Sequence, residues 1–137
     1  MSLRAVLDTN IFISGMMLPG SAPGRLLNIW LEGTYDVLTC DAHIEELKRV
    51  SRYSKIRSRV PSFSIGRMVN QLRETAIYVA RLPAIDASPD PWDNYLLALA
   101  QTGEADFLVT GDKAGLLALE RFGMARIVTA RQFLESF

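Results

Sequence analysis

The sequence contains a single cysteine, a single histidine and no long apolar run. With Cys40 alone, the chain cannot form an internal disulfide or a cysteine-built zinc site, and we expect it in a reducing cytoplasm. His43 is likewise the sole imidazole, which excludes sites built from several histidines. Any metal site in this chain must therefore rely on oxygen ligands.

The lack of a long apolar run also excludes a membrane span, which needs about 18 consecutive apolar residues. The chain does not open on a charged segment followed by an apolar core, so we expect no signal peptide. Its 137 residues, of which 49% are hydrophobic, are typical of one packed domain covering residues 1–137. No glycine-rich loop follows the first apolar segment, which argues against a dinucleotide-binding enzyme.

The charges balance in number but are segregated along the chain. Lysine and arginine total 15, as do aspartate and glutamate. Residues 48–59 contain six basic and no acidic side chains, whereas residues 86–112 contain six acidic and no basic ones. Such segregation favours a basic track for a polyanion beside an acidic pocket for a cation. The alternative is that the basic run is an ordinary solvated helix end and loop.

Short apolar segments alternate with helical patterns, which predicts an α/β fold. We expect a three-layer α/β/α sandwich with a central parallel sheet of four to five strands. The expected strands are residues 4–7, 35–39, 76–80, 106–110 and 126–129. The expected helices are residues 11–18, 21–31, 41–50, 65–74, 91–102, 116–119 and 131–137.

Two of the expected strands end in a carboxylate. Residues 5–7 are continuously apolar, and Asp8 follows them directly. The expected strand at residues 106–110 ends at Thr110 and is followed by Gly111 and Asp112. Ligands of open α/β sheets bind outside the carboxyl ends of the strands. We expect Gly111 to allow a tight turn that aims Asp112 over the sheet edge. Each aspartate has an alternative role as the N-cap of the helix that follows. Two carboxylates on neighbouring strands would have to share a proton or a cation.

Two further acids are chosen over their acidic neighbours. Asp90 stands before Pro91 as an expected helix N-cap, so Asp93 is the better candidate ligand. On the helix after residue 40, a turn of about 100° per residue places Glu46 near the apolar face and Glu45 on the opposite side. Glu46 is therefore the candidate for the site, and Glu45 is expected in solvent. The alternative for Glu46 is an exposed helix glutamate.

Four sequence blocks together are similar to the PIN-domain family, and most of all to the VapC-like toxins of toxin–antitoxin systems. The blocks are residues 6–14, Glu46-Leu47, residues 90–94 and residues 109–112, and the resemblance spans essentially the whole chain. It differs at Cys40, where the family usually has Ser, and at Trp92, where it usually has an acidic or polar residue. The resemblance implies an acidic catalytic and metal-binding site with three supporting polar residues. These residues are Asp8, Glu46, Asp93 and Asp112, supported by Thr9, Asn10 and Thr110.

The residue types suit a Mg²⁺- or Mn²⁺-dependent ribonuclease. Carboxylates attract a hard divalent cation, which lowers the pKa of a bound water and stabilises charge on a phosphodiester. No side chain pairs with a base as a covalent nucleophile. We expect the basic track to hold the phosphates of RNA, and we consider Tyr53 as a possible stacking residue. The substrate-binding candidates are Lys48, Arg49, Arg52 and Lys55.

Two other functions remain open. One is a non-catalytic PIN-like nucleic-acid-binding module, although four unused buried carboxylates would be costly. The other is a metal-dependent phosphohydrolase on a similar fold. Aspartyl-phosphate enzymes usually carry a second acid two residues after the nucleophile, and that position is Asn10 here. The resemblance also implies a cognate antitoxin protein and a homodimer, with no membrane partner.

Overall fold

The computed structural model describes residues 2–112 and 114–137. The strands are β1 (Arg4–Leu7), β2 (Asp36–Thr39), β3 (Ile77–Tyr78), β4 (Phe107–Val109), β5 (Arg121–Phe122) and β6 (Ala125–Val128). The α-helices are α1 (Thr9–Met17), α2 (Ala22–Leu31), α3 (Asp41–Ser51), α4 (Ser54–Arg57), α5 (Ser62–Thr75), α6 (Asn94–Thr102), α7 (Leu116–Leu119) and α8 (Ala130–Leu134), with a 3₁₀ turn η1 (Pro91–Asp93) before α6.

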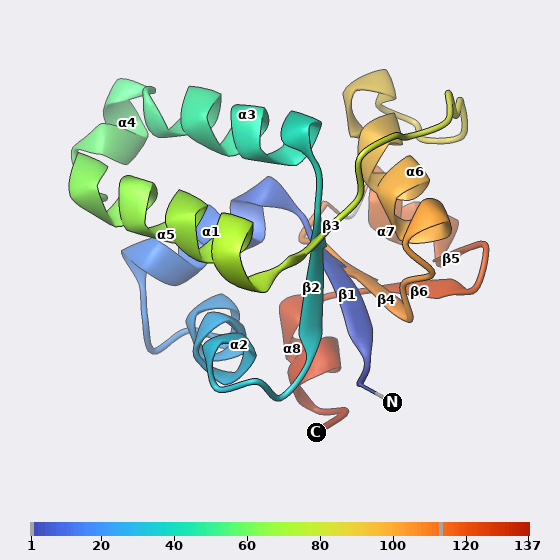
Figure 1. Ribbon diagram of the computed structural model, residues 1–137, viewed down its shortest axis with the longest axis horizontal. Coiled ribbons are helices and arrows are strands. Elements are labelled where there is room, and N and C mark those ends of the chain that lie inside the picture. Colours follow the sequence, from blue (N-terminus) through green and yellow to red (C-terminus); the bar gives the residue numbers. More distant parts are fainter. Residues whose placement is uncertain (1, 113) are drawn as a thin grey trace.

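The six strands form one mixed, mostly parallel sheet in the order β3-β2-β1-β4-β6-β5 (Figure 1). β1 lies between β2 and β4 and is parallel to both. Five of the strands are parallel, as the predicted four to five allow, and an unpredicted sixth strand, β5, pairs antiparallel to β6. The two are joined at Gly123, whose φ of 58° lies in the left-handed region that glycine adopts readily.

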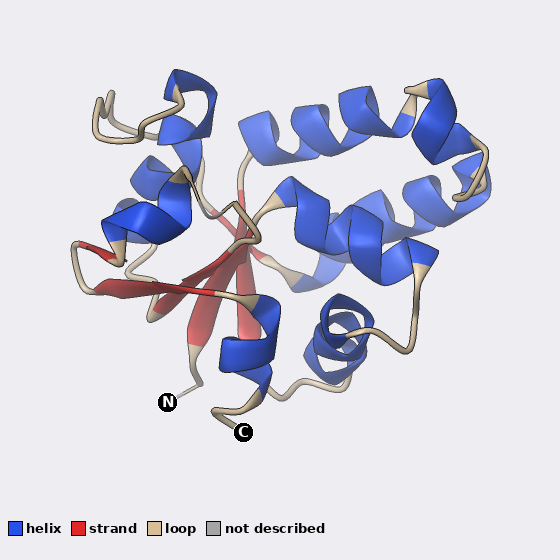
Figure 2. Cartoon of the chain, turned by 180° about the vertical axis from the view of Figure 1, so that it is seen from behind, coloured by secondary structure: helices blue, strands red, loops and turns tan. Residues whose placement is uncertain are grey.

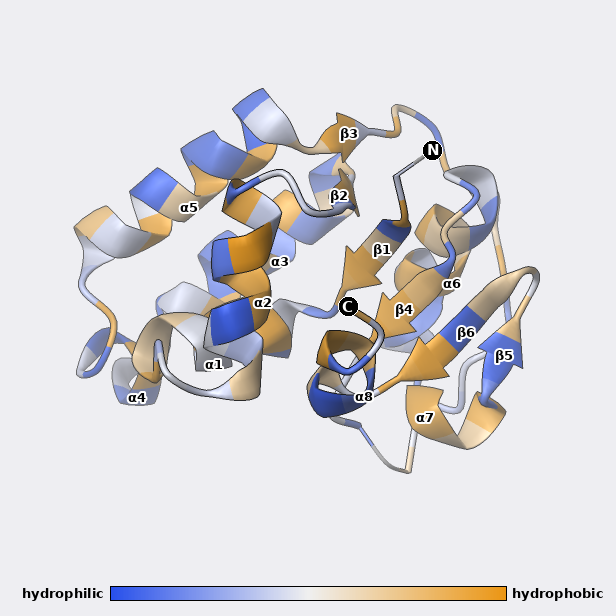
Figure 3. Ribbon diagram, turned by 90° about the horizontal axis from the view of Figure 1, so that it is seen from below, coloured by the Kyte–Doolittle hydropathy of each residue, from blue (hydrophilic) through white to orange (hydrophobic). Residues whose placement is uncertain are grey.

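Helices cover both faces of the sheet, so the predicted three-layer α/β fold is confirmed (Figures 2 and 3). Along β1, Ala5 and Leu7 pack into a core with α1, α2, α3, α5 and α8, whereas Val6 packs into a second core with α6 and α7. β4 alternates in the same way, with Val109 in the first core and Leu108 in the second. Strands buried on both faces explain the continuous apolar runs of the sequence.

Three local differences from the expected elements affect the site. α1 begins at Thr9, directly after Asp8, and not at residue 11. The helix expected at residues 91–102 is divided into η1 and α6, and Asp93 lies at the junction. The basic segment contains the short helix α4, which the sequence did not indicate. Within residues 2–112 and 114–137, every helix is too short or too polar to cross a membrane.

The topology brings the ends of β1 and β4 together. The two strands are paired in parallel, with Leu7 opposite Val109, and the Asp8 amide donates to the Val109 carbonyl at 2.9 Å. The residues that follow these strands, Asp8 and Thr110, therefore leave the sheet at the same edge. In Figure 1 this edge faces α3 and the segment before α6, and the chain termini lie at the opposite end.

Candidate acidic active site

Asp8 is a buried carboxylate, with 7% of its surface exposed. It stands at the N-cap position of α1, yet its side chain does not cap the helix. Its Oδ2 accepts a hydrogen bond from Thr110 Oγ1 at 2.8 Å. Burial raises the pKa of Asp8, the bond from Thr110 lowers it in part, and the charge of Glu46 raises it further. The capping alternative for Asp8 is therefore excluded.

Asp112 is held by the turn that carries it. Its amide donates to Thr110 Oγ1 at 3.2 Å, and its Oδ1 accepts from the Gly115 amide at 3.0 Å. A Cβ at position 115 would lie 2.0 Å from Asp112 Oδ2, so the carboxylate keeps this position only with glycine at 115 and would have to move otherwise. Gly111 has no positive φ and open space around it, so the turn toward Asp112 does not depend on the conformational freedom of glycine at 111. Asp112 is also not the N-cap of α7, because Gly115 takes that position.

Glu46 faces the sheet edge from α3. Its Oε1 accepts hydrogen bonds from Thr9 Oγ1 and from the Tyr95 hydroxyl, the latter at 2.9 Å. Its Oε2 lies 3.8 Å from Arg49, one turn along the helix. The side chain of Glu46 is 20% exposed, whereas that of Glu45 is 72% exposed and lies 3.7 Å from Lys48. These exposures agree with the prediction from the helical repeat, which placed Glu46 near the apolar face and Glu45 in solvent.

Asp90 and Asp93 differ as the sequence indicated. Asp90 caps η1, because its Oδ1 accepts from the Trp92 amide at 3.1 Å. Asp93 ends η1 and does not cap α6 with its side chain. The segment before η1 is fixed by Asn94, whose Oδ1 accepts from the Ser88 amide at 2.8 Å. Among the described residues, the Asp93 carboxylate therefore caps no helix, and it is partly buried in the same hollow as the other acids.

The four predicted carboxylates line one hollow of about 670 Å³. Its walls also include Thr9, the exposed Asn10, Asp90 and Trp92. Burial and the charges of Asp8, Asp90, Asp112 and Glu46 together raise the pKa of Asp93 to about 7. Acids that lie more than 80 residues apart in the chain therefore repel one another across this hollow.

The chemistry of these side chains fits a hard divalent cation. All candidate ligands are carboxylate oxygens, and the one cationic side chain seen within 4.0 Å of them among the described residues is Arg49, beside Glu46. Among the described residues, the structure has no group of three Asp, Glu, His or Cys side chains that lie close enough together to coordinate one metal ion. Asp8 and Asp112 extend from adjacent strands, so they are the residues best placed to hold a metal, with Asp93 and Glu46 nearby.

The predicted substrate-binding cations lie along α3 and beyond it. Arg49 lines the acidic hollow, and Arg52 and Lys48 line a basic groove between α3, α4 and α5. That groove also contains Arg57 and Arg73. Lys55 is exposed on α4 and is not among the residues that line either space. A track of positive charge thus starts at the edge of the acidic hollow.

Two residues of the site were missed from the sequence. Tyr95, which fixes Glu46, stands in a Leu- and Ala-rich helix whose periodicity gives no sign of a polar role. Gly115 did carry a signal, because aspartate at the first position and glycine at the fourth favour a type I turn, as in Asp112 and Gly115. Both residues position a carboxylate.

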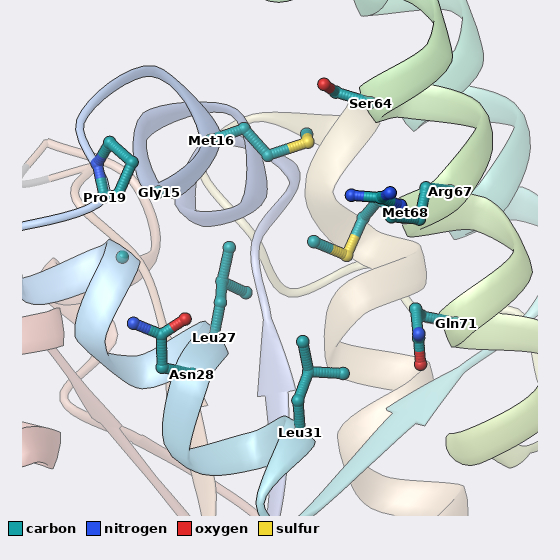
Figure 4. Close-up of a pocket in the computed structure, with 11 residues that line it drawn as sticks. Gly15, Met16, Pro19, Leu27, Asn28, Leu31, Ser64, Arg67, Met68 and Gln71 are labelled. Atoms are coloured by element: carbon teal, nitrogen blue, oxygen red, sulfur yellow. The ribbon is translucent and has the colours of Figure 1, made fainter.

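A separate hollow is lined by residues of α1, α2 and α5 (Figure 4). Leu27, Leu31 and Met68 point toward this space, with Arg67 and Gln71 at its α5 side. None of the residues that line it is acidic. It is a mainly apolar groove that shares no lining residue with the acidic hollow.

The comparisons with known proteins agree with this geometry. A family model described as "PIN domain" matches residues 4–114, a segment that contains all four carboxylates. Uncharacterized protein MJ1680 of Methanocaldococcus jannaschii is 21% identical over 143 aligned positions, covering 98% of this chain and 92% of that protein. PIN domains have a nuclease-like fold and typically use a divalent metal. The chain belongs to the PIN domain family.

Proposed function

We propose that this protein is a Mg²⁺- or Mn²⁺-dependent endoribonuclease. The observation that supports it most is the single hollow lined by Asp8, Glu46, Asp93 and Asp112. Burial and the charges of the surrounding acids raise the pKa of Asp93 to about 7, and a bound cation would relieve the repulsion among these acids. Phosphodiester cleavage is the reaction that such a carboxylate site beside a basic track suits best.

A divalent ion bound by Asp8 and Asp112 would lower the pKa of a water and neutralise charge on the phosphate. The protein's own side chains prepare this chemistry. Thr110 holds the Asp8 carboxylate at 2.8 Å, and the Gly115 amide holds that of Asp112 at 3.0 Å. Asp93 lines the same hollow, so we assign it to hold a second ion or to orient the attacking water.

Glu46 has a different environment from Asp93. Thr9 and Tyr95 both donate to its Oε1, and Arg49 lies beside its Oε2. These hydrogen bonds fix the position of the Glu46 carboxylate, so we assign Glu46 to orient the water or a second ion. The expected supporting residue Asn10 is exposed at the rim, where it is available to the substrate.

The two alternatives are a non-catalytic RNA-binding module and a phosphohydrolase. A binding module has no use for four acids around one hollow, because such charges destabilise the fold when nothing neutralises them. A phosphohydrolase working through an aspartyl-phosphate would need an acid at Asn10, which lines the same hollow. Neither alternative accounts for the basic track and the acids together.

The same proposal includes the biological setting. We infer that the protein is the toxin of a toxin–antitoxin pair, with a small cognate antitoxin, and that it forms a homodimer. The resemblance to VapC-like proteins supports this part. A short reading frame next to the gene, whose product co-purifies with this chain and suppresses its cleavage of RNA, is the result expected. A monomer with no such companion would favour a solitary nuclease.

The test is cleavage of labelled single-stranded RNA by the purified protein. We expect cleavage with Mn²⁺ or Mg²⁺, none with EDTA, and a loss of roughly 100-fold or more in Asp8→Asn. Asp86→Asn is the matched control, since Asp86 is an exposed aspartate outside the hollow. RNA that is bound but not cut would favour the binding module. Hydrolysis of small phosphate esters with intact RNA would favour the phosphohydrolase.

A further inference from the structure

Trp92 is the most exposed large hydrophobic side chain described, with 82% of its surface accessible. It follows Pro91 in η1 and precedes Asp93, so it stands at the mouth of the acidic hollow. Its backbone is fixed, because the Trp92 amide donates to Asp90 Oδ1 at 3.1 Å. A large aromatic ring held in place but left in water has its faces free for a ligand.

Trp92 borders two spaces at once. Besides the acidic hollow, it lines a neighbouring one of about 390 Å³ over the outer side of α3. Glu46 and Arg49 also line both, so these three residues form the wall between the two spaces. The neighbouring space is completed by Ala42, Glu45, Arg52 and Tyr95.

The cations of this second space connect it with the basic groove. Arg49 is 57% exposed at its side chain, and Arg52 is exposed and also lines the groove that contains Lys48 and Arg57. The order along the surface is therefore acidic hollow, Trp92 with Arg49, Arg52, and then the basic groove. Each neighbouring pair of spaces in this order shares a lining residue.

We propose that the space beside Trp92 is a nucleotide subsite, in which an unpaired base next to the cleaved bond stacks on the Trp92 indole. Arg49 and Arg52 contact the phosphate of that nucleotide. This inference rests on the proposed function, because it takes RNA as the ligand. Every base has a π-face, so stacking accepts any sequence but requires a base that is not already paired. The subsite therefore selects single strands over duplexes.

The acids of this space do not oppose the assignment. Glu45 is paired with Lys48 at 3.7 Å, and Glu46 is held by Thr9 and Tyr95. Tyr53, the stacking candidate from the sequence, is less suited, since its hydroxyl accepts from Arg49 and its ring lies 6.0 Å from that guanidinium. Tyr53 instead helps to position Arg49.

The experiment measures binding in EDTA, where a metal-dependent enzyme does not cut. The chain has two tryptophans, and Trp30 is only 1% exposed, so quenching of the fluorescence by a single-stranded RNA oligonucleotide reports on Trp92. We expect quenching by the single strand and little by the duplex. The variants lack this fluorophore, so their affinity is measured by the fluorescence anisotropy of a labelled strand: Trp92→Ala should weaken single-strand binding about 10-fold, and Trp92→Phe should retain most of it. Phe63→Ala is the control, as Phe63 is 70% exposed and lies outside this space.

A second measurement separates stacking from a general loss of structure. A series of oligonucleotides is used, each of which lacks the base at one different position. One of these abasic positions should weaken binding to the wild type. The same abasic position should not weaken binding to Trp92→Ala, which has already lost the stacking contact. Equal affinity of Trp92→Ala and the wild type, or additive losses at every abasic position, would overturn the subsite. If either result is found while the wild type still cleaves RNA, the subsite is wrong and the proposed ribonuclease function is retained. RNA that quenches Trp92 but is never cut would contradict the ribonuclease and leave the subsite.

Discussion

Thr110 joins the two strands that carry the acids of the site. Its hydroxyl donates to Asp8 Oδ2 at 2.8 Å and accepts from the Asp112 amide at 3.2 Å. Thr110 is fully buried, and Asp8 is nearly so. One hydroxyl thus sets the positions of both residues that extend from the ends of β1 and β4.

Thr110→Val removes this hydroxyl with almost no change in shape. Asp8 then loses its donor while it remains buried, so its pKa rises further and the fold loses about 1–3 kcal/mol. We expect RNA cleavage to fall roughly 10- to 100-fold, as is typical when a residue that orients a ligand is lost. Thr110→Ser, which retains the hydroxyl, should recover most of the rate. Equal losses in both variants would show that the methyl group, and not the bond to Asp8, matters.

Gly115→Ala tests whether Asp112 needs the space beside the turn. The new Cβ would lie 2.0 Å from Asp112 Oδ2, so the carboxylate must move. We expect a loss of cleavage of about 10-fold or more, since a displacement of about 1 Å can cost 100-fold. Gly20→Ala is the control, because Gly20 has open space around it and no positive φ and should be neutral or up to about 1 kcal/mol more stable. Full activity in Gly115→Ala would show that Asp112 has no fixed role.

The sequence predicted the layers and the edge of the sheet because both follow from short-range patterns. Apolar runs that end in Asp8 and in Thr110 and Asp112 are signs of buried parallel strands, and parallel strands present their carboxyl ends at one edge. The helical repeat is also a short-range pattern, and it distinguished the partly buried Glu46 from the exposed Glu45. These predictions needed only the order of apolar and polar residues within single elements.

What the sequence did not predict depends on contacts between distant elements. Tyr95 reaches Glu46 because α6 packs beside α3, a relation that no periodicity contains. β5 has two residues, too few for an alternating pattern, and its signal was limited to the turn at Gly123. Residues 91–102 are divided into the 3₁₀ turn η1, which Asp90 caps, and the helix α6. Propensity predicts one helix there and does not place Asp93 at the junction of the two.

His43 gives the fold a defined sensitivity to acid. It packs against Phe12 and Tyr95, and neither ring nitrogen has a hydrogen-bond partner among the described residues. Burial lowers the pKa of His43 from 6.5 to about 4. The unfolded chain therefore binds the proton first, so stability is full above pH 6.5 and falls as the pH drops toward 4.

Urea unfolding at pH 8 and pH 5 measures this effect. Between pH 6.5 and 5 the wild type should lose about 2 kcal/mol through His43. His43→Leu removes this contribution, so its stability should change less between the two pH values than that of the wild type. The aspartates titrate in both proteins and cancel in the comparison. Identical pH dependence in the two proteins would mean that His43 ionises within the folded state.

Asp93→Asn should make the metal-free protein more stable while it abolishes cleavage. The pKa of Asp93 is raised from 3.8 to about 7, mainly by burial and by the charge of Asp8, so the folded state binds the proton more tightly than the unfolded chain. The contribution of Asp93 to stability is therefore present below pH 4 and is lost as the pH rises to 7. Since Asp93 is partly exposed, solvent screening limits the gain from Asn to about 1 kcal/mol, or 2–4 °C in Tm at pH 8.

Divalent cations should reverse this ranking, because they bind the wild type through the same carboxylate. With EDTA at pH 8 the variant melts higher, and with millimolar Mn²⁺ the wild type gains more in Tm than the variant, by the mass action of a ligand that binds the folded state. At pH 4.5, where Asp93 is protonated in the folded protein, the two melting temperatures should converge in EDTA. Asp86→Asn, an exposed aspartate in the loop before η1, should follow the wild type throughout. A variant that melts lower than the wild type in EDTA at pH 8 would show that Asp93 stabilises the fold and that the four acids do not oppose one another in the hollow.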